Sequence, residues 1–295
     1  MYSYRMMIPA LLIYSVFYMI PLIIGLVMSF TNWNIENLQF SGAFLNMKGL
    51  KFRGMDNYSA IFKDRHFILS LKNTIIFAVA TTILKLALGL LLALALNMKL
   101  RTRKFLRTVY YIPAVLSYIV VGVLFSSILR TDGMFNTALG ALLGRNISHD
   151  WLGDPGTAMG CIIAVEVWKW SGYVMTVFLA GLQGISQEYY EAAKIDGANS
   201  FQSFKFITLP LLLPSFTVNI TMCIIGGFKV FDQVFVMTNG GPGFATQVLN
   251  TMIYQAFSEG RLAKSSAMGI VLFVFISVIS VTLSYTLHRK ERNIT

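Results

Sequence analysis

The chain has 295 residues, of which 56% are hydrophobic and 13% charged, and its mean hydropathy is +0.65. A water-soluble domain carries about 25% charged residues, so this composition excludes an ordinary soluble protein and predicts an integral membrane protein. The net charge of +11 does not indicate a nucleic-acid binder, because the basic residues lack the interleaved aromatic residues of a nucleic-acid groove.

Six apolar runs are long enough to cross about 30 Å of hydrocarbon. The first contains Pro9 and Pro21 without a small-residue cleavage site, so we interpret it as a retained helix and not as a signal peptide. We expect Pro113 in the first turn of the third helix, where a missing N–H costs little. The sequence predicts an all-α integral membrane protein with one transmembrane domain over residues 1–295. Its six helices are predicted at about residues 6–30, 71–98, 109–129, 158–182, 207–228 and 267–287.

Basic residues predict the orientation of these helices. The segment Lys99–Arg107, between the second and third runs, contains five basic residues and no acidic one. Because Lys and Arg concentrate in cytoplasmic loops, we expect this segment, the polar stretch after the fourth run and both termini to face the cytoplasm.

A polar stretch separates the fourth and fifth apolar runs. Residues Gln187–Asp196 can form a short amphipathic helix that Gly197 ends, and Asn199 or Ser200 can cap a second helix. The sequence therefore predicts a helix, a sharp turn and a helix. Such a pair could lie on the membrane surface without a partner, but an interfacial helix favours Trp and Lys over a Glu-Ala-Ala sequence.

Several motifs resemble those of binding-protein-dependent ABC importer permeases. The residues Glu191-Ala192-Ala193, Asp196-Gly197-Ala198 and Ile207 with Leu209-Pro210 resemble the "EAA" signature of that family. The stretches Lys229–Asp232 and Met237–Gly243 resemble the sugar and glycerol-3-phosphate branch. That branch includes the maltose-type first permease, which pairs with a second, different permease. Similarity also extends to the segment Gly49–Tyr58, before the second helix.

The resemblance implies the six-helix permease core of a type I ABC importer. Its loop at about residues 186–208 would insert into a cytoplasmic ATPase and act as a lever. The family commonly has proline where this chain has Ser186, and the serine hydroxyl can cap the helix instead. The expected docking residues are Glu191, Ala192, Ala193, Asp196 and Gly197.

The resemblance also implies partners and a location. The sequence has no G-x-x-x-x-G-K-[ST] motif, so ATP and Mg²⁺ are expected on partner subunits and no cofactor on this chain. The expected partners are a second homologous permease, two ATP-binding subunits, an extracytoplasmic solute-binding protein and a sugar. The expected location is the cell membrane of a bacterium or archaeon.

Polar residues inside the predicted helices indicate where a substrate could pass. A charge at the bilayer centre costs roughly 2.5–3.5 kcal/mol and must face protein or water. Lys85 is one such charge, and two others, three residues apart, can partly neutralise one another. Aromatic rings beside them suit the C–H faces of a sugar. An equally open alternative is that these polar groups only hold helices together. The candidates are Glu166, Lys169, Trp170, Tyr173, Thr217 and Asn219.

A third group of candidates follows the fifth helix. Asp232 and the sequence Gly240-Gly241-Pro242 could form a mobile outer loop that gates the pathway or touches a substrate-delivering protein. The alternative is a simple turn, which Gly-Gly-Pro commonly forms. The two cysteines and three histidines show no metal-ligand spacing, so no metal site is expected.

We expect an importer permease for a carbohydrate or polyol that works by alternating access. The docking loop does not indicate the cargo, so a peptide or polyamine importer stays open. A secondary carrier without an ATPase is less favoured, because neither paired half-repeats nor broken helices in corresponding positions are evident. A membrane enzyme is weaker still, because no nucleophile, base and orienting residue form a convincing set.

Overall fold

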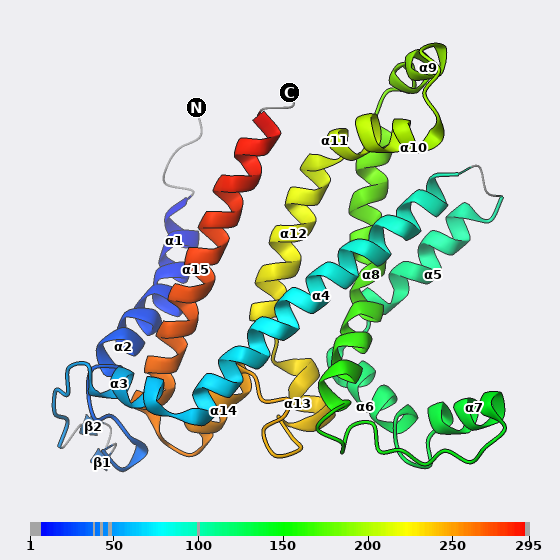
Figure 1. The fold of residues 1–295 in the computed structure, drawn as a ribbon. Helices are drawn as coiled ribbons and strands as arrows, with labels where there is room; N and C mark the ends of the chain where they lie inside the picture. The colour runs from blue at the N-terminus through cyan, green and yellow to red at the C-terminus, as the bar shows by residue number, and fades with distance from the viewer. Residues whose placement is uncertain (1–6, 38, 42–43, 47–48, 99–100, 293–295) are drawn as a thin grey trace. The chain divides into compact units, whose positions relative to one another are not determined.

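A computed structural model describes residues 7–37, 39–41, 44–46, 49–98 and 101–292. Its polypeptide divides into two units, one within residues 1–71 and 249–275 and the other within residues 72–248 and 276–295. Two long helices, α4 (Arg65–Asn97) and α15 (Leu262–Arg292), begin in the first unit and end in the second. Figure 1 gives the order of the elements along the chain. Each unit is described separately below.

The first unit contains the predicted first helix and the outer segment after it. The predicted helix starts at Met6, which is outside the described residues. A π-helical turn at Ser15–Met19 separates α1 from α2. The remaining elements are α1 (Ile8–Tyr14), α2 (Ile20–Met28), a 3₁₀ turn (Ile35–Asn37), β1 (Gln39–Ser41), β2 (Phe44–Asn46), α3 (Asp56–Lys63) and α14 (Leu249–Ser258). The two strands pair antiparallel and add six residues of sheet to an otherwise helical protein.

An ion pair connects distant segments of the first unit. The Lys264 ammonium lies 2.8 Å from a carboxylate oxygen of Asp64. Partial burial acts to raise the pKa of Asp64. Hydrogen bonds from the Lys264 ammonium and the His66 backbone N–H, together with the positive charges of the Lys264 and His66 side chains, outweigh this effect, so the pKa of Asp64 lies below its ordinary value. The carboxylate is therefore held in its charged form at neutral pH.

The second unit is a helical bundle that contains all of the predicted functional residues. In Figure 1 the helices α9 and α10 lie at one end of this unit, and α6, α7 and α13 lie at the other. Its complete elements are α5 (Arg103–Val115), α6 (Tyr118–Ile128), α7 (Met134–Leu143), α8 (Ala158–Gly184), α9 (Gln187–Ile195), α10 (Ser200–Ser203), a π-helical turn (Phe204–Thr208), α11 (Leu209–Leu211), α12 (Leu213–Phe228) and α13 (Asp232–Thr238).

Two of the predicted spans are bent helix pairs. The axes of α5 and α6 differ by 97°, and those of the segments 200–211 and 213–228 differ by 63°. The described chain therefore has four straight spans, and the predicted six when each bent pair counts as one. Pro113 lies near the end of α5 and not in a first turn as expected. Basic residues before the apolar run extend that helix back to Arg103, which moves the proline to the C-terminal end.

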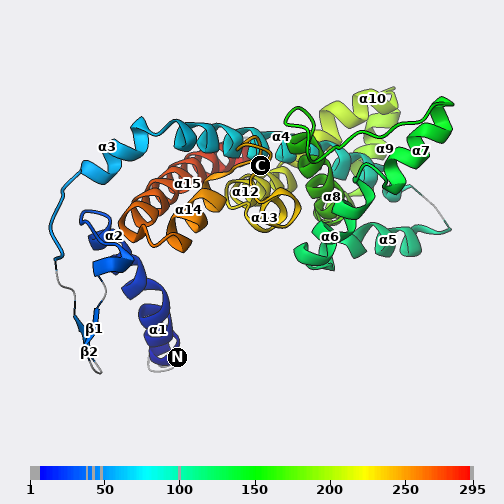
Figure 2. The same cartoon turned by 90° about the horizontal axis from the view of Figure 1, so that it is seen from below.

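The helix α8 lies at the centre of the second unit. Within its most apolar window 56% of the residues are buried, against 33% or less in the other three straight spans. A cluster of buried side chains that includes Val174, Phe178 and Leu212 packs α8 against α12. On another side α8 packs against α5, as Figure 2 shows from the end of the bundle.

Gly172 lets α5 and α8 approach one another closely. A methyl group at this position would collide with the backbone carbonyl of Tyr110 on α5. The atoms that the methyl group would meet belong to the backbone of α5. A larger side chain at position 172 could therefore fit only if the two helices moved apart.

We therefore expect Gly172→Val to destabilise the bundle by about 1–3 kcal/mol or more, the usual range for overpacking. Thermal unfolding in detergent, followed by tryptophan fluorescence, measures the effect. Gly160→Val is the matched control, because Gly160 is on the same helix and nothing lies within 4 Å of its added methyl group. Equal shifts in both variants would contradict the close approach at Gly172.

Candidate functional site

The docking loop predicted at residues 186–208 begins with a capped helix. The Ser186 hydroxyl accepts a hydrogen bond from the Glu188 N–H at 3.3 Å and so caps α9. Serine therefore performs the capping role that the sequence analysis expected of it. Gly197 follows the helix with a φ of +79°, a left-handed conformation that glycine adopts without strain.

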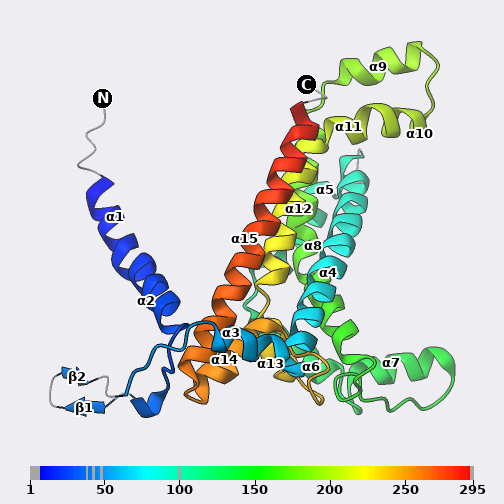
Figure 3. The same ribbon diagram turned by 60° about the vertical axis from the view of Figure 1, so that its left-hand side comes forward.

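The second half of the loop is held by equally local bonds. Asn199 caps α10 and forms a reciprocal capping box with Gln202, with N···O distances of 2.8 and 2.9 Å. The Tyr190 hydroxyl lies 3.0 Å from the Thr208 hydroxyl and connects α9 to the turn before α11. The two helices thus form a hairpin of defined shape, and Figure 3 shows it projecting from the ends of α8 and α12.

The surface of this hairpin carries both charged and large apolar side chains. Glu191 and Ala192 are exposed, whereas Ala193 is buried. Ile195 and Phe201 are 86% and 70% exposed, respectively. Large apolar side chains exposed on a polar segment are typical of a protein interaction site. The predicted docking residues are therefore brought together on one short element.

Inside the bundle, Glu166 pairs with Lys85 of α4 and not with Lys169 as the sequence analysis expected. The Lys85 ammonium lies 2.8 Å from a Glu166 carboxylate oxygen, and both side chains are at most 7% exposed. The two residues are 81 positions apart, so only the packing of α4 against α8 brings them together. The pair neutralises two charges that would be costly to bury singly.

Lys169 contacts the break between α5 and α6. Its ammonium donates to the carbonyl oxygens of Pro113 at 3.1 Å and Ala114 at 3.3 Å, and also to that of Leu116. These carbonyls lie where the helix ends and its own N–H donors are lost. The buried ammonium therefore satisfies the backbone of a bent span, which is a structural role.

Aromatic residues surround the same position. The Lys169 ammonium lies 4.8 Å from the ring centre of Tyr118, and the indole N–H of Trp170 donates to the Tyr118 hydroxyl at 2.7 Å. The Trp170 and Tyr173 rings meet edge to face with centroids 5.8 Å apart. Trp170 and Tyr173 are only partly buried, so they keep apolar ring surface that a ligand could contact. Tyr118 was not identified from the sequence.

The two candidates on α12 are both buried. The Thr217 hydroxyl donates to the Leu213 carbonyl at 3.1 Å, within its own helix. The Asn219 amide donates to the Val174 carbonyl of α8 at 3.4 Å and is fully buried. In this conformation the polar groups of Thr217 and Asn219 bond to backbone carbonyls, and both side chains are buried. Trp170 and Tyr173 are therefore the better placed of the predicted pathway residues.

The predicted outer gate is an ordered loop. Asp232 is exposed at the start of α13, and Gly240 has a φ of +86° in a place where an added methyl group would meet Gln247. The Gly241–Pro242 bond is cis. The Thr246 hydroxyl donates to the Gly241 carbonyl at 2.6 Å and lies 2.7 Å from the Thr238 hydroxyl.

A buried side chain outside the loop holds it in place. The Asn73 amide donates to the carbonyls of Phe244, Ala245 and Gln247 at 3.4, 3.1 and 3.0 Å. The sequence analysis missed this role, since an asparagine at the start of a helix has no feature that identifies a partner more than 170 residues away. The loop thus has a defined conformation and is anchored to α4 by Asn73.

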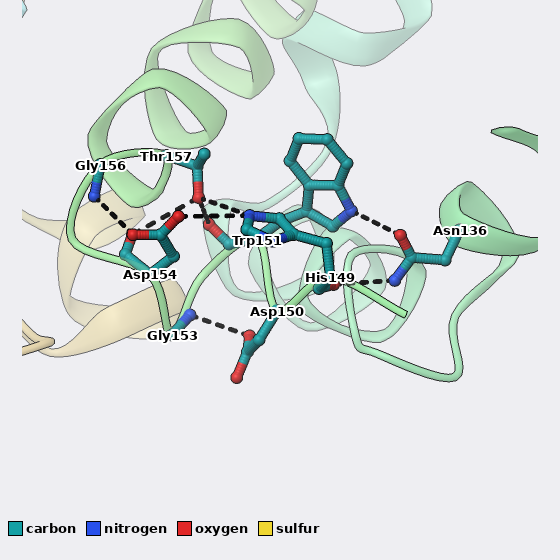
Figure 4. A network of polar contacts seen from close by, with 8 residues as sticks. All are labelled: Asn136, His149, Asp150, Trp151, Gly153, Asp154, Gly156 and Thr157. Carbon is teal, nitrogen blue, oxygen red and sulfur yellow. Dashed lines mark hydrogen bonds and ion pairs between the residues drawn. The ribbon is translucent and has the colours of Figure 1, made fainter. Parts of the chain in front are cut away.

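The sequence analysis also missed a polar network between α7 and α8 (Figure 4). The Asn136 amide donates to the carbonyl of His149 at 2.8 Å and accepts from the indole N–H of Trp151 at 2.8 Å. The His149 ring lies 3.3 Å from the Asp154 carboxylate, and the Thr157 hydroxyl donates to the Trp151 carbonyl. These bonds fold the connection between the two helices into a fixed shape. Among the described residues no group of His, Cys, Asp and Glu could hold a metal ion.

The sequence profile of one family matches residues 85–293, more than half of the chain. That family is described as the binding-protein-dependent transport system inner membrane component. This chain belongs to it. The matched region includes the bent spans, the hairpin and the outer loop, so the inner membrane component is a multi-pass membrane protein and a transport subunit.

Full-length relatives extend this result over the whole chain. This chain is 34% identical over 288 residues to the probable starch degradation products transport system permease protein of Thermoanaerobacterium thermosulfurigenes. The alignment covers 96% of this chain and 92% of the relative. The chain is 35% identical over 284 residues to the trehalose/maltose transport system permease protein of Thermococcus litoralis, with 96% and 92% coverage.

A solved structure shows the same architecture. One chain of a bacterial alginate ABC transporter, determined in complex with an alginate pentasaccharide-bound periplasmic protein, superimposes with a TM-score of 0.82 at 25% identity. The match covers 98% of this chain and 94% of that chain. The all-α permease fold expected from the sequence is therefore confirmed.

The ion pair between Lys85 and Glu166 can be tested with a double substitution. We expect Glu166→Leu to cost about 3–5 kcal/mol, because it leaves a buried ammonium without its partner, whereas Lys85→Met with Glu166→Leu should recover most of that loss. Thermal unfolding in detergent measures the unsubstituted protein, the two single variants Lys85→Met and Glu166→Leu, and the double variant. A double variant as unstable as the sum of the two single variants would contradict the pairing.

Proposed function

We propose that this chain is the permease subunit of an ATP-driven importer that moves a sugar into the cell by alternating access. The observation that carries the proposal is the ordered α9–α10 hairpin, which presents Glu191, Ala192 and an apolar surface at one end of a membrane bundle in a member of this family. Carbohydrate systems among the relatives' names, together with the alginate transporter, support a sugar or a related polyol as cargo.

The hairpin is proposed to dock into a cytoplasmic ATPase. Glu191 offers a carboxylate to a basic partner residue, and the small, exposed side chain of Ala192 permits close approach, while Ala193 is buried within this chain. The local hydrogen bonds at Ser186 and Asn199 would stiffen the hairpin, so that it could transmit a movement of the ATPase to α8 and α12. Asp196 and Gly197 complete the turn that sets the angle between the two helices.

The proposed assembly contains two ATP-binding subunits, a second homologous permease and an extracytoplasmic solute-binding protein. ATP and Mg²⁺ would be bound by the ATPases, and this chain would bind no cofactor. The ATPase-binding end of the bundle would be the cytoplasmic side, and both termini are proposed to lie in the cytoplasm of a bacterial or archaeal cell. The basic residues Arg101, Arg103, Lys104 and Arg107, in and just before α5, support that orientation.

The sugar is proposed to contact Trp170 and Tyr173. Their edge-to-face arrangement leaves ring surface available, and the Tyr118 hydroxyl beside them can exchange hydrogen bonds with a polyol. The substrate-contacting region would be held in position by the buried polar residues Glu166, Lys169, Thr217 and Asn219. The loop with Asp232, Gly240, Gly241 and Pro242 would gate the outer opening, moving as one piece with its Asn73 anchor.

Two other functions are consistent with parts of this picture. An importer permease for a non-sugar solute would use the same hairpin, since docking does not depend on cargo. An ATP-independent secondary carrier would not require an exposed hairpin of this kind. Sugar-stimulated ATP hydrolysis by the assembled complex separates the proposed function from both alternatives, because only the proposed function predicts it.

Substitution of the hairpin tests the docking role. We expect Glu191→Arg and Gly197→Asp each to abolish uptake while the protein stays inserted, because the first reverses a contact charge and the second strains the turn. Uptake of labelled sugar by cells and the amount of protein in their membranes are measured together.

The chain offers two matched controls for these variants. Glu36→Arg makes the same charge change at an exposed position outside the hairpin, and Gly144→Asp replaces another left-handed glycine, with a φ of +64°. Both should transport normally. Normal uptake by both hairpin variants, or loss of uptake in the controls, would count against docking through the hairpin.

Truncation of the aromatic residues tests the substrate site. We expect Trp170→Ala and Tyr173→Ala to raise the sugar concentration for half-maximal uptake by about fivefold, a typical loss for one aromatic contact. Trp168→Ala is the control, because Trp168 packs edge to face against Phe125 and not against Trp170 or Tyr173. Unchanged half-maximal concentrations at native expression would favour a purely structural role for both residues.

A further inference from the structure

Two arginines at the hairpin end of α5 converge on a single neutral side chain. With its amide oriented by these donors, the Gln183 oxygen accepts a hydrogen bond from Arg107 at 3.1 Å and another from Arg103. Gln183 lies on α8, four residues before α9 begins. Two positive charges are thus held side by side at the boundary between the membrane-spanning bundle and the docking hairpin.

No carboxylate balances these charges within the described part of the chain. Neither Arg103 nor Arg107 is within ion-pair distance of an acidic side chain there. Their Nε atoms are buried and find no acceptor among the described residues. A carbonyl oxygen has two lone pairs, so Gln183 cannot satisfy the remaining guanidinium donors. Their chemistry calls for an oxyanion with several acceptor atoms.

An apolar groove begins at the same place. A cavity of about 590 Å³ is lined by Arg107 and Thr108, by Tyr111, Ile112 and Val115 further along α5, and by Thr176 of α8. Ile112 and Val115 are 50% and 74% exposed. From Arg107 to Val115 the helix rises about 12 Å. The positively charged Arg107 and the apolar groove therefore lie along the same helix.

We propose that this place binds an anionic phospholipid of the cytoplasmic leaflet, with its phosphate on Arg103 and Arg107 and an acyl chain in the groove along α5. The side of the membrane rests on the proposed function. A phosphate diester supplies the oxyanion, and the chain explains why the apolar groove continues directly from the arginines. Basic pockets between helices on the cytoplasmic side are suited to such headgroups.

The lipid would act on a mechanically central pair of helices. α5 is in contact with α8 at Gly172 and at the carbonyls that Lys169 satisfies, and Gln183 precedes the docking hairpin by four residues. A bound phosphate would reduce the repulsion between the two guanidiniums and strengthen the junction of α5 with α8. The site therefore couples the lipid composition of the membrane to the region that the hairpin moves.

The test is native mass spectrometry of the chain, purified with its bound subunits, after addition of either dioleoylphosphatidylglycerol or dioleoylphosphatidylcholine. We expect preferential retention of the anionic lipid. Arg103→Gln with Arg107→Gln should lower that retention about 30-fold, since each basic residue near the surface contributes about fivefold. An excess of inorganic phosphate should not displace the lipid, because phosphate alone lacks the acyl chain.

Two further variants keep the test decisive. Arg101→Gln with Lys104→Gln removes the same charge from exposed positions of the same segment, and it should retain the lipid. Val115→Trp fills the groove without changing charge, and it should lower retention at least tenfold. This second variant gives a result even if the arginine variant fails to fold.

Several results would overturn the proposal. They are equal retention of both lipids, equal loss in the two charge variants, unchanged retention in Val115→Trp, or displacement by inorganic phosphate. Crosslinking of the Ile112→Cys variant to the paired permease would do the same, because a protein would then cover the groove. ATPase subunits are scored in the same spectra, so their absence would contradict the proposed function while the lipid result still stands.

Discussion

The architecture of the bundle depends on how the broken span at α5–α6 satisfies its backbone. In hydrocarbon every free carbonyl needs a donor, and a bend of 97° removes several helical N–H donors at once. The buried ammonium of Lys169 on α8 donates hydrogen bonds to three carbonyl oxygens at this break in place of helical N–H groups. That single side chain allows α6 to leave the direction of α5, and it brings Tyr118 to Trp170. The aromatic pair proposed to contact substrate is arranged around this structural charge.

A second consequence concerns the transmission of movement. The helix α8 carries the Glu166 that pairs with α4, the Lys169 that holds the break and the Gln183 that receives two arginines. It then passes through Ser186 directly into the docking hairpin. Because the polar contacts of α8 reach α4, α5 and α12, a displacement of the hairpin would be distributed through the bundle by side chains that are already bonded. The aromatic site lies between these contacts.

Local chemistry made several parts of this protein predictable. The apolar runs located the spans because a bilayer of about 30 Å demands them, and the hairpin followed from Ser186, Gly197 and Asn199, whose capping and turn preferences act within a few residues. The bend after Pro113 was missed, because amphipathic residues upstream extended the helix and changed the proline's position. The partner of Glu166 was mistaken for a residue one turn away, since spacing on one helix gives no information about a neighbouring helix.

By itself, the sequence determined the membrane class, the spans and their approximate limits, the hairpin and the family, because each depends on composition or on contacts between nearby residues. Tertiary structure alone decided which buried charges meet, how Asn73 anchors the outer loop and how Asn136 organises the connection before α8. These contacts join residues whose separation along the chain carries no signal. They form only when helix packing brings them within about 3 Å, the distance at which a hydrogen bond exists.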